Sequence, residues 1–293
     1  TFEAIHQFGG LTATDIPPLL QTIWKTTPKT TEVIPMFKTF TATAGLIGLS
    51  IFAAPVLADS YKIGLSAEPY PPFYAPDASG NWSGWEIDFI EELCDRLDAK
   101  CEIKPVAWEG IIPALKTGKI DMIIGSMSIT PERAEQIAFS NKYYSSPTGI
   151  LARKSTDIEP TPEGLEGAYL GIQSGTNQEQ YARKHFADSA NLNVYQTLNE
   201  ELQDLVAGRI DAIVADTLAV QTFINSETGQ SCCEYRGEVA SDPELMSEGM
   251  GVGLRQSDTE LRERVNSAID AMRADSTYEE ISAPYFDFDI YGS

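Results

Sequence analysis

Residues 125–133 contain the polar side chains of this chain best suited to binding chemistry. Residues 120–124 are predicted to form a strand, and Thr130 followed by Pro131 is typical of a helix N-cap and first helical residue. Arg133 then lies in the first turn, where a cation opposes the partial positive charge of the helix N-terminus, so an anion is expected nearby. With the free N–H groups of the segment, Arg133 can bind a small carboxylate by charge-assisted hydrogen bonds. The candidate residues of this segment are Gly125, Ser126, Met127, Ser128 and Arg133.

An ordinary strand-to-helix turn would contain the same residues. In that interpretation Arg133 points into water or pairs with Glu132 or Glu135, and arginines are common on protein surfaces. The segment alone does not decide between the two interpretations.

A second polar segment follows a predicted strand at residues 169–172. Thr176 and Glu179 have the spacing of a capping box, so a helix is expected to begin here and to direct its first N–H groups outward. The glycine spacing is that of neither a Walker loop nor a dinucleotide-binding fingerprint, and a lone helix start is usually structural. The candidate residues of this segment are Gln173, Thr176, Asn177 and Gln178.

Asp216 follows a third predicted strand, residues 210–215, and its carboxylate either is satisfied by a neighbouring loop or binds an ammonium group. Arg133, the helix N-termini and Asp216 together match the two opposite charges of an α-amino acid. Tyr70 and Trp108, in two further loops, can sandwich a ligand side chain, although loop aromatics more often pack as caps.

An internal repeat indicates how these segments are positioned. Residues 115–124 recur as residues 205–214, and each copy predicts a helix closed by glycine and followed by a short buried strand. The repeat predicts two lobes, although the same pattern occurs in many α/β proteins. The alternating elements predict an α/β fold with mostly parallel sheets flanked by helices. Ligands bind beyond the carboxyl ends of such strands, where all three polar segments lie.

The beginning of the chain predicts export. Residues 36–58 have the basic start, apolar stretch and small-residue end of a signal peptide cleaved after Ala58, and residues 1–35 are interpreted as an upstream or non-native segment. The net charge of −22 falls on the chain after residue 58, because acidic and basic residues balance before it. This acidity argues against nucleic acid as a partner, and its simplest role is solubility.

Cysteine spacing supports the same compartment. Cys94 and Cys101 are expected to form a disulfide in an oxidising environment, whereas the adjacent Cys232 and Cys233, placed in a polar loop, are either free or bridged to each other. No CxxC or Cys/His zinc spacing occurs, and neither a metal nor a cofactor is expected.

Residues 61–292 resemble the type 3 extracellular solute-binding proteins, the amino-acid-binding components of ABC importers. The motifs that carry the resemblance are Tyr70-Pro71-Pro72-Phe73, Gly84-Trp85-Glu86-Ile87-Asp88, Glu92-Leu93-Cys94, Ile112-Pro113-Ala114-Leu115, Ser126-Met127-Ser128-Ile129-Thr130, Gly208-Arg209-Ile210-Asp211 and Tyr285-Phe286-Asp287-Phe288. The chain looks most like the branch that binds lysine, arginine, ornithine or histidine, in which a disulfide occupies the positions of Cys94 and Cys101.

The resemblance implies a role for each candidate residue. Arg133 and the amides near Ser126, Ser128 and Asn177 would hold the ligand carboxylate, and Asp216 with the two serines would hold the ammonium. Tyr70 and Trp108 would stack on the ligand side chain.

The chain also departs from that branch. Gly125 replaces a common serine, the loop before Tyr70 has an additional residue, and Ala67 stands where the branch has an acidic residue. Glu68, next to Ala67, is therefore the candidate acidic selector, and its alternative is to face water.

The expected function is that of a monomeric periplasmic protein, without catalysis, that delivers an amino acid to the membrane permease of an ABC transporter. Residues 59–145 and 249–293 would form one lobe and residues 146–248 the other, closing about a two-stranded hinge near residues 145–148 and 240–249. A cyclohexadienyl or arogenate dehydratase-like enzyme on the same fold is the alternative, although His185 is the only histidine after the signal peptide and acid/base work would fall to carboxylates. A ligand-presenting sensor component is the third possibility.

Overall fold

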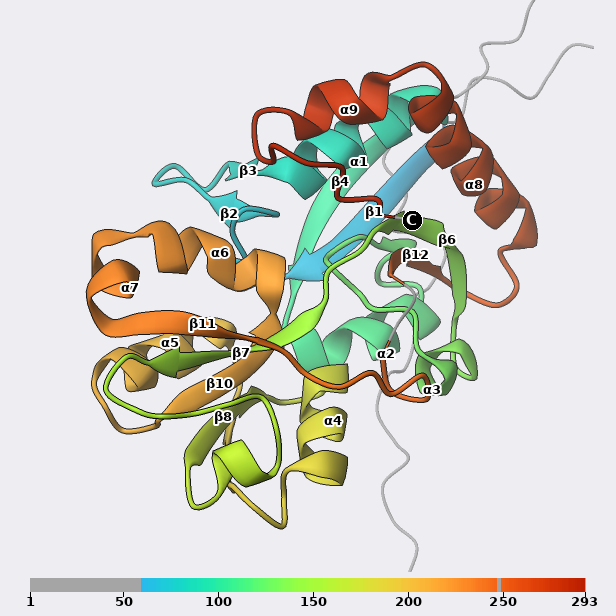
Figure 1. Cartoon of the computed structure of the whole chain (residues 1–293). Helices are drawn as coiled ribbons and strands as arrows, with labels where there is room; N and C mark the ends of the chain where they lie inside the picture. The colour runs from blue at the N-terminus through green and yellow to red at the C-terminus, as the bar shows by residue number, and fades with distance from the viewer. Residues whose placement is uncertain (1–58, 247–248, 293) are drawn as a thin grey trace, which may run out of the picture. The chain divides into compact units, whose positions relative to one another are not determined.

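The computed structural model describes residues 59–246 and 249–292. The upstream segment and the signal peptide predicted from the sequence lie outside the described residues. Two five-stranded sheets, each flanked by helices, make up the α/β fold, and a two-stranded ribbon joins β2 (Ala75–Pro76) to β3 (Trp82–Ser83) (Figure 1). In the described part of the chain, no helix is both long and apolar enough to cross a membrane.

The first sheet has the strand order β4-β1-β5-β12-β6. Its strands are β1 (Asp59–Ser66), β4 (Ala99–Val106), β5 (Met122–Ile123), β6 (Ala138–Tyr144) and β12 (Met250–Leu254). The helices of this lobe are α1 (Trp85–Arg96), the 3₁₀ turn η1 (Trp108–Gly110), α2 (Ile111–Lys116), α3 (Pro131–Ala134), α8 (Thr259–Ala274) and α9 (Thr277–Ser282).

The second sheet has the order β11-β7-β10-β8-β9. Its strands are β7 (Thr148–Arg153), β8 (Tyr169–Gln173), β9 (Asn191–Tyr195), β10 (Ala212–Asp216) and β11 (Cys233–Glu238). Its helices are the 3₁₀ turn η2 (Glu163–Leu165), α4 (Asn177–His185), α5 (Leu198–Val206), α6 (Thr217–Asn225) and α7 (Glu227–Cys232).

Each sheet is mostly parallel, as predicted, and contains one reversed strand. In the first sheet β12 runs against its neighbours, and in the second sheet β7 does. The chain crosses between the sheets twice, from β6 to β7 and from β11 to β12, and each reversed strand is the first strand after a crossing. Each crossing leaves one sheet at the carboxyl ends of its parallel strands and reaches the other sheet at the carboxyl ends of its parallel strands. The next strand must therefore run in the opposite direction to those parallel strands. The carboxyl ends of β1, β5, β8 and β10 therefore face the crossovers. The lobe boundaries and the hinge drawn from the sequence stay predictions.

The two copies of the internal repeat also form equivalent hydrogen bonds, which the sequence did not reveal. Gly118 and Gly208 close their helices with φ of 72° and 70°, which glycine adopts without a Cβ penalty. Asp121 accepts a hydrogen bond at 3.0 Å from the N–H of Lys62, and Asp211 accepts one at 2.9 Å from the N–H of Tyr169. Each aspartate thus ties the residue before its own strand to the neighbouring parallel strand, at Lys62 within β1 and at Tyr169, the first residue of β8. The predicted strand at 120–124 shortens to Met122–Ile123 in β5.

Both cysteine pairs are bridged. Cys94 in α1 is joined to Cys101 in β4 with a Cα separation of 6.2 Å, so the predicted disulfide ties a helix to its neighbouring strand. Cys232 is joined to Cys233, which resolves the alternative left open by the sequence. The pair lies at the junction of α7 and β11 rather than in a polar loop, and Cys233 is buried.

Candidate functional site

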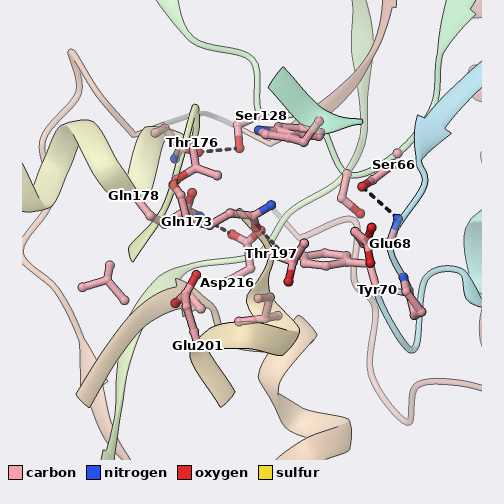
Figure 2. Close-up of a pocket in the computed structure, with 18 of the residues that line it drawn as sticks. Ser66, Glu68, Tyr70, Ser128, Gln173, Thr176, Gln178, Thr197, Glu201 and Asp216 are labelled. Carbon is pink, nitrogen blue, oxygen red and sulfur yellow. Dashed lines mark hydrogen bonds between the residues drawn. The ribbon is translucent and has the colours of Figure 1, made fainter. Parts of the chain in front are cut away.

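One pocket lies where the carboxyl ends of strands from both sheets meet, and Figure 2 shows most of its lining. Twelve of the thirteen residues expected to contact a ligand line it: Glu68, Tyr70, Trp108, Gly125, Ser126, Ser128, Arg133, Gln173, Thr176, Asn177, Gln178 and Asp216. Met127 does not, and this expectation was wrong. Its side chain is 1% exposed and packs in the apolar cluster of Ile111 and Leu115, because it points away from the face that carries Ser126 and Ser128.

Arg133 is buried in the pocket and not on the surface. It is 7% exposed, and its guanidinium donates to the carbonyl oxygens of Ser128 at 3.0 Å and Gly175 at 3.1 Å. Its guanidinium carbon lies 5.5 Å from the ring centre of Trp108. Among the described residues no carboxylate forms an ion pair with Arg133, so the surface interpretation is wrong. Burial lowers the pKa of Arg133 to about 10, and it stays cationic at neutral pH.

Asp216 supplies the opposite charge. It ends β10, is 5% exposed, and accepts hydrogen bonds from the hydroxyl of Tyr70 at 2.8 Å and the amide of Gln178 at 2.9 Å. Burial raises the pKa of Asp216 to about 6, although these bonds and the positive charge of Arg133 lower it. The pocket therefore holds one buried cation and one buried anion that do not neutralise each other by direct contact.

The helix N-terminus of α4 borders the same pocket. The hydroxyl of Thr176 accepts from the N–H of Glu179 at 3.0 Å, as the predicted capping box requires. The reciprocal bond differs from that prediction, because the Glu179 carboxylate accepts from the N–H of Gly175 at 2.7 Å. Asn177 and Gln178 lie in the first turn, where backbone N–H groups have no intrahelical acceptor and remain available for an anion.

Hydrogen bonds across the pocket hold the two lobes together. Ser128 donates to the side-chain oxygen of Asn177 at 3.1 Å, and the indole of Trp108 donates to the carbonyl of Gly175 at 3.2 Å. Arg133 donates to the carbonyl oxygen of Gly175, and the hydroxyl of Tyr70 donates to Asp216, so these two bonds also cross the pocket. Ser128 and Arg133, two residues of the first lobe expected to bind the α-amino acid core, thus contact residues of the second lobe.

Sequence comparison over the residues that form the two sheets and the pocket identifies the family. Residues 61–288 match the model of the bacterial extracellular solute-binding proteins, family 3. The chain belongs to this family. The resemblance inferred from its motifs is therefore confirmed.

Relatives in this family bear the names of binding proteins. The histidine-binding periplasmic protein of Salmonella typhimurium is 38% identical over 250 residues, which cover 84% of this chain and 96% of that protein. The lysine/arginine/ornithine-binding periplasmic protein of Escherichia coli is 37% identical over 262 residues, covering 88% of this chain and 100% of that protein. A solved structure of an ancestral arginine-binding protein bound to arginine superposes with a TM-score of 0.70 at 32% identity, covering 78% of this chain and 98% of the other.

Sequence reasoning missed the support behind Ser126 in this family 3 site. Ser126 has φ of 57°, a left-handed conformation that is strained for serine. Glu86, fully buried in α1, accepts its N–H at 2.7 Å and its hydroxyl at 3.1 Å, and also bonds the Tyr143 hydroxyl. The N–H of Ser126 therefore donates to Glu86 and not to a ligand, whereas the other amides expected to bind the carboxylate stay a prediction. Burial raises the pKa of Glu86 to about 7.

Two glutamates near the pocket differ from expectation. Glu68 lines the pocket as predicted, but its side chain is exposed. Glu201, which sequence reasoning did not select, lines the pocket and is fully buried. The available signal was its spacing, because Glu201 lies between Leu198 and Leu205 on the apolar face of α5, where a charged residue is out of place.

The described residues contain no cluster of three or more His, Cys, Asp or Glu side chains that could hold a metal ion. His185 pairs with Asp242 at 2.6 Å and does not line the pocket.

Proposed function

We propose that the protein binds an L-α-amino acid with a polar or basic side chain in the periplasm and delivers it to the membrane permease of an ABC importer. The observation that carries the proposal is the pair of buried, uncompensated charges, Arg133 and Asp216, at opposite lobes of one pocket. Arg133 would bind the α-carboxylate together with the first N–H groups of α4. Asp216 would bind the α-ammonium, with the hydroxyls of Ser126 and Ser128 as further acceptors.

Lobe closure is the proposed mechanism of capture. Each lobe supplies only part of the charge complement, so the complete site exists only when the lobes meet. A ligand that contacts both lobes binds the closed form better and shifts the population toward it. The names of the two periplasmic relatives support a periplasmic location, and the signal peptide predicted at residues 36–58 agrees with it. Membership of the family of extracellular solute-binding proteins supports an ABC transporter as the partner.

Calorimetric titration tests the proposal. The protein, freed of ligand by unfolding and refolding, is titrated with L-arginine, L-lysine, L-histidine, L-glutamine and L-leucine, and with the blocked derivatives Nα-acetyl-L-arginine and L-argininamide. We expect one-to-one binding of one or more free amino acids and loss of binding for both blocked forms, since each removes one of the two charges. Equal affinity for free and blocked arginine, or no binding of any amino acid, would refute the proposal.

A dehydratase-like enzyme is the second candidate, and one observation favours it. Burial raises the pKa of Asp216 in the pocket to about 6 and that of Glu86, which lies behind Ser126, to about 7, and such groups can transfer protons near neutral pH. Incubation of the protein with prephenate or arogenate distinguishes the two functions. Turnover that Asp216→Asn abolishes would support an enzyme, and the absence of turnover in protein that binds amino acids would support transport.

A further inference from the structure

One buried carboxylate of the pocket has no role in binding the α-amino acid core. Glu201 is 0% exposed, and neither of its carboxylate oxygens accepts a hydrogen bond from any residue that the structure describes. Arg133, the buried cation of the same pocket, donates its hydrogen bonds to Ser128 and Gly175 instead. Glu201 therefore differs from Asp216, whose two oxygens are both bonded.

The backbone holds Glu201 in place. It lies in the first turn of α5, whose start is fixed by a complete capping box between Thr197 and Glu200. Leu198 and Leu205, on the same face, are buried and anchor the helix against the core. In Figure 2 the carboxylate of Glu201 points from its helix toward the side of the pocket that holds Asp216. The carboxylate is thus held by the fold and directed into the site.

A buried carboxylate that accepts no hydrogen bond costs free energy relative to one in water. Desolvation penalises its charged form, and burial raises the pKa of Glu201 well above its usual range. A cation that enters the pocket removes this penalty, because it supplies both charge and hydrogen-bond donors. The two carboxylate oxygens of Glu201 match the paired N–H groups of a guanidinium, and they can also accept from an ammonium group.

We propose that Glu201 binds the cationic end of the ligand side chain and thereby selects amino acids that carry a guanidinium or ammonium group. This inference rests on the proposed function, because Arg133 and Asp216 must first hold the α-carboxylate and α-ammonium. A neutral side chain in the same place would leave Glu201 desolvated and unpaired, which is the physical basis of the selection.

Glu68 is the competing selector, and the two differ in burial. The side chain of Glu68 is exposed, so its charge is already solvated and loses little when a neutral ligand binds. The carboxylate of Glu201 has no solvent to replace a missing partner. Discrimination between charged and neutral side chains should therefore depend on Glu201.

A matched pair of ligands isolates the contribution of the charge. L-Arginine and L-citrulline have nearly the same shape, but citrulline lacks the positive charge. The ratio of their dissociation constants is measured by calorimetry for the wild type and for Glu201→Gln. Glu200→Gln is the control, since it makes the same change one residue away, outside the pocket lining, and glutamine also serves in a capping box.

We expect the wild type to prefer arginine, and Glu201→Gln to reduce this preference at least about thirtyfold, as for loss of one partner of a buried charge pair. Citrulline should bind Glu201→Gln at least as tightly as it binds the wild type, which also shows that the variant is folded. Glu200→Gln should keep the wild-type ratio within about threefold.

Several outcomes would overturn the assignment. An arginine-to-citrulline ratio in Glu201→Gln within threefold of the wild type would do so, as would a wild type that prefers citrulline or leucine. A loss of preference in Glu68→Gln, with none in Glu201→Gln, would identify Glu68 as the selector instead. In each of these cases amino acids still bind and only the selector fails, whereas absence of all amino-acid binding by the wild type would refute the proposed function as well.

Discussion

Ligand affinity should fall as the pH is lowered through the pKa of Asp216. Burial raises this pKa to about 6, so the carboxyl group is largely ionised at pH 7 and largely protonated at pH 5. Only the ionised form attracts the ligand ammonium, whose own charge does not change in this range. The sign follows from this preference: protons and ligand compete, and acid weakens binding.

The size of the effect follows from the ionised fraction. With a pKa of about 6 that fraction is about 0.9 at pH 7, about 0.09 at pH 5 and about 0.01 at pH 4. The dissociation constant should therefore rise about tenfold from pH 7 to pH 5 and about a hundredfold by pH 4. Binding of an amino acid with an uncharged side chain, such as L-glutamine, at pH 5 should release close to one proton from Asp216, because the ligand selects the ionised carboxylate.

Asp216→Asn separates this residue from other groups that titrate. At pH 7 the variant should bind at least about thirtyfold more weakly, because the ligand ammonium loses its buried counter-charge. Between pH 7 and pH 5 its affinity should change much less than that of the wild type. A residual slope would belong to Glu86, whose pKa of about 7 lies in the same range and whose carboxylate holds Ser126, or to Glu201, whose pKa burial also raises.

Calorimetry at constant ionic strength, in buffers of different ionisation enthalpy, measures both the affinity and the proton release. Thermal unfolding of each sample confirms that the protein is folded at each pH. A wild-type affinity that stays within threefold between pH 7 and pH 5 would refute the assignment of Asp216 to the ammonium. Identical pH profiles for the wild type and Asp216→Asn would refute it equally.

Three further predictions follow from the described structure. Arg133→Ala should weaken amino-acid binding by at least about a hundredfold in calorimetry. Its thermal unfolding should stay near that of the wild type, because Arg133 has no ion-pair partner that the substitution would leave unpaired. An affinity within threefold of the wild type would contradict the role of Arg133. Cys94 and Cys101 should appear as a linked pair in non-reducing peptide maps of exported protein, and their bridge should contribute about 2.5 kcal/mol to the free energy of unfolding, whereas two free thiols would disprove the pairing. Saturating ligand should lower the radius of gyration in small-angle scattering, and an unchanged radius would count against hinge closure.

The charged centre of the site could be predicted from the sequence because local rules fix its backbone. Thr130 and Pro131 define the start of α3 and place Arg133 in its first turn, and the buried strand β10 delivers Asp216 to the carboxyl edge of its sheet. Neither inference required knowledge of packing between elements. The same holds for Glu68, whose position beside Tyr70 placed it at the pocket, but exposure depends on tertiary contacts and was not predictable.

The errors have equally specific causes. Met127 was assigned to the site with its neighbours Ser126 and Ser128, but its side chain packs into the apolar cluster of Ile111 and Leu115, a tertiary contact that the polar character of the segment does not reveal. The left-handed conformation of Ser126 and its support by Glu86 depend on a contact between residues 40 positions apart. Glu201 was overlooked although it lies between Leu198 and Leu205 on the apolar face of α5, because its burial depends on how that helix packs against the rest of the protein.

The distribution of charge in the pocket gives a physical reason for coupling between binding and closure. If the lobes close as proposed, a closed form without ligand would hold Arg133, Asp216 and Glu201 away from water with no ionic partner, and Glu201 would also have no hydrogen-bond donor. An amino acid with a cationic side chain carries one complementary charge for each of the three. The free energy that burial costs in the empty closed form is then recovered only when all three contacts are made. Because a ligand shifts an equilibrium only by its difference in affinity for the two states, this arrangement should make closure depend on the complete ligand and not on either of its ends.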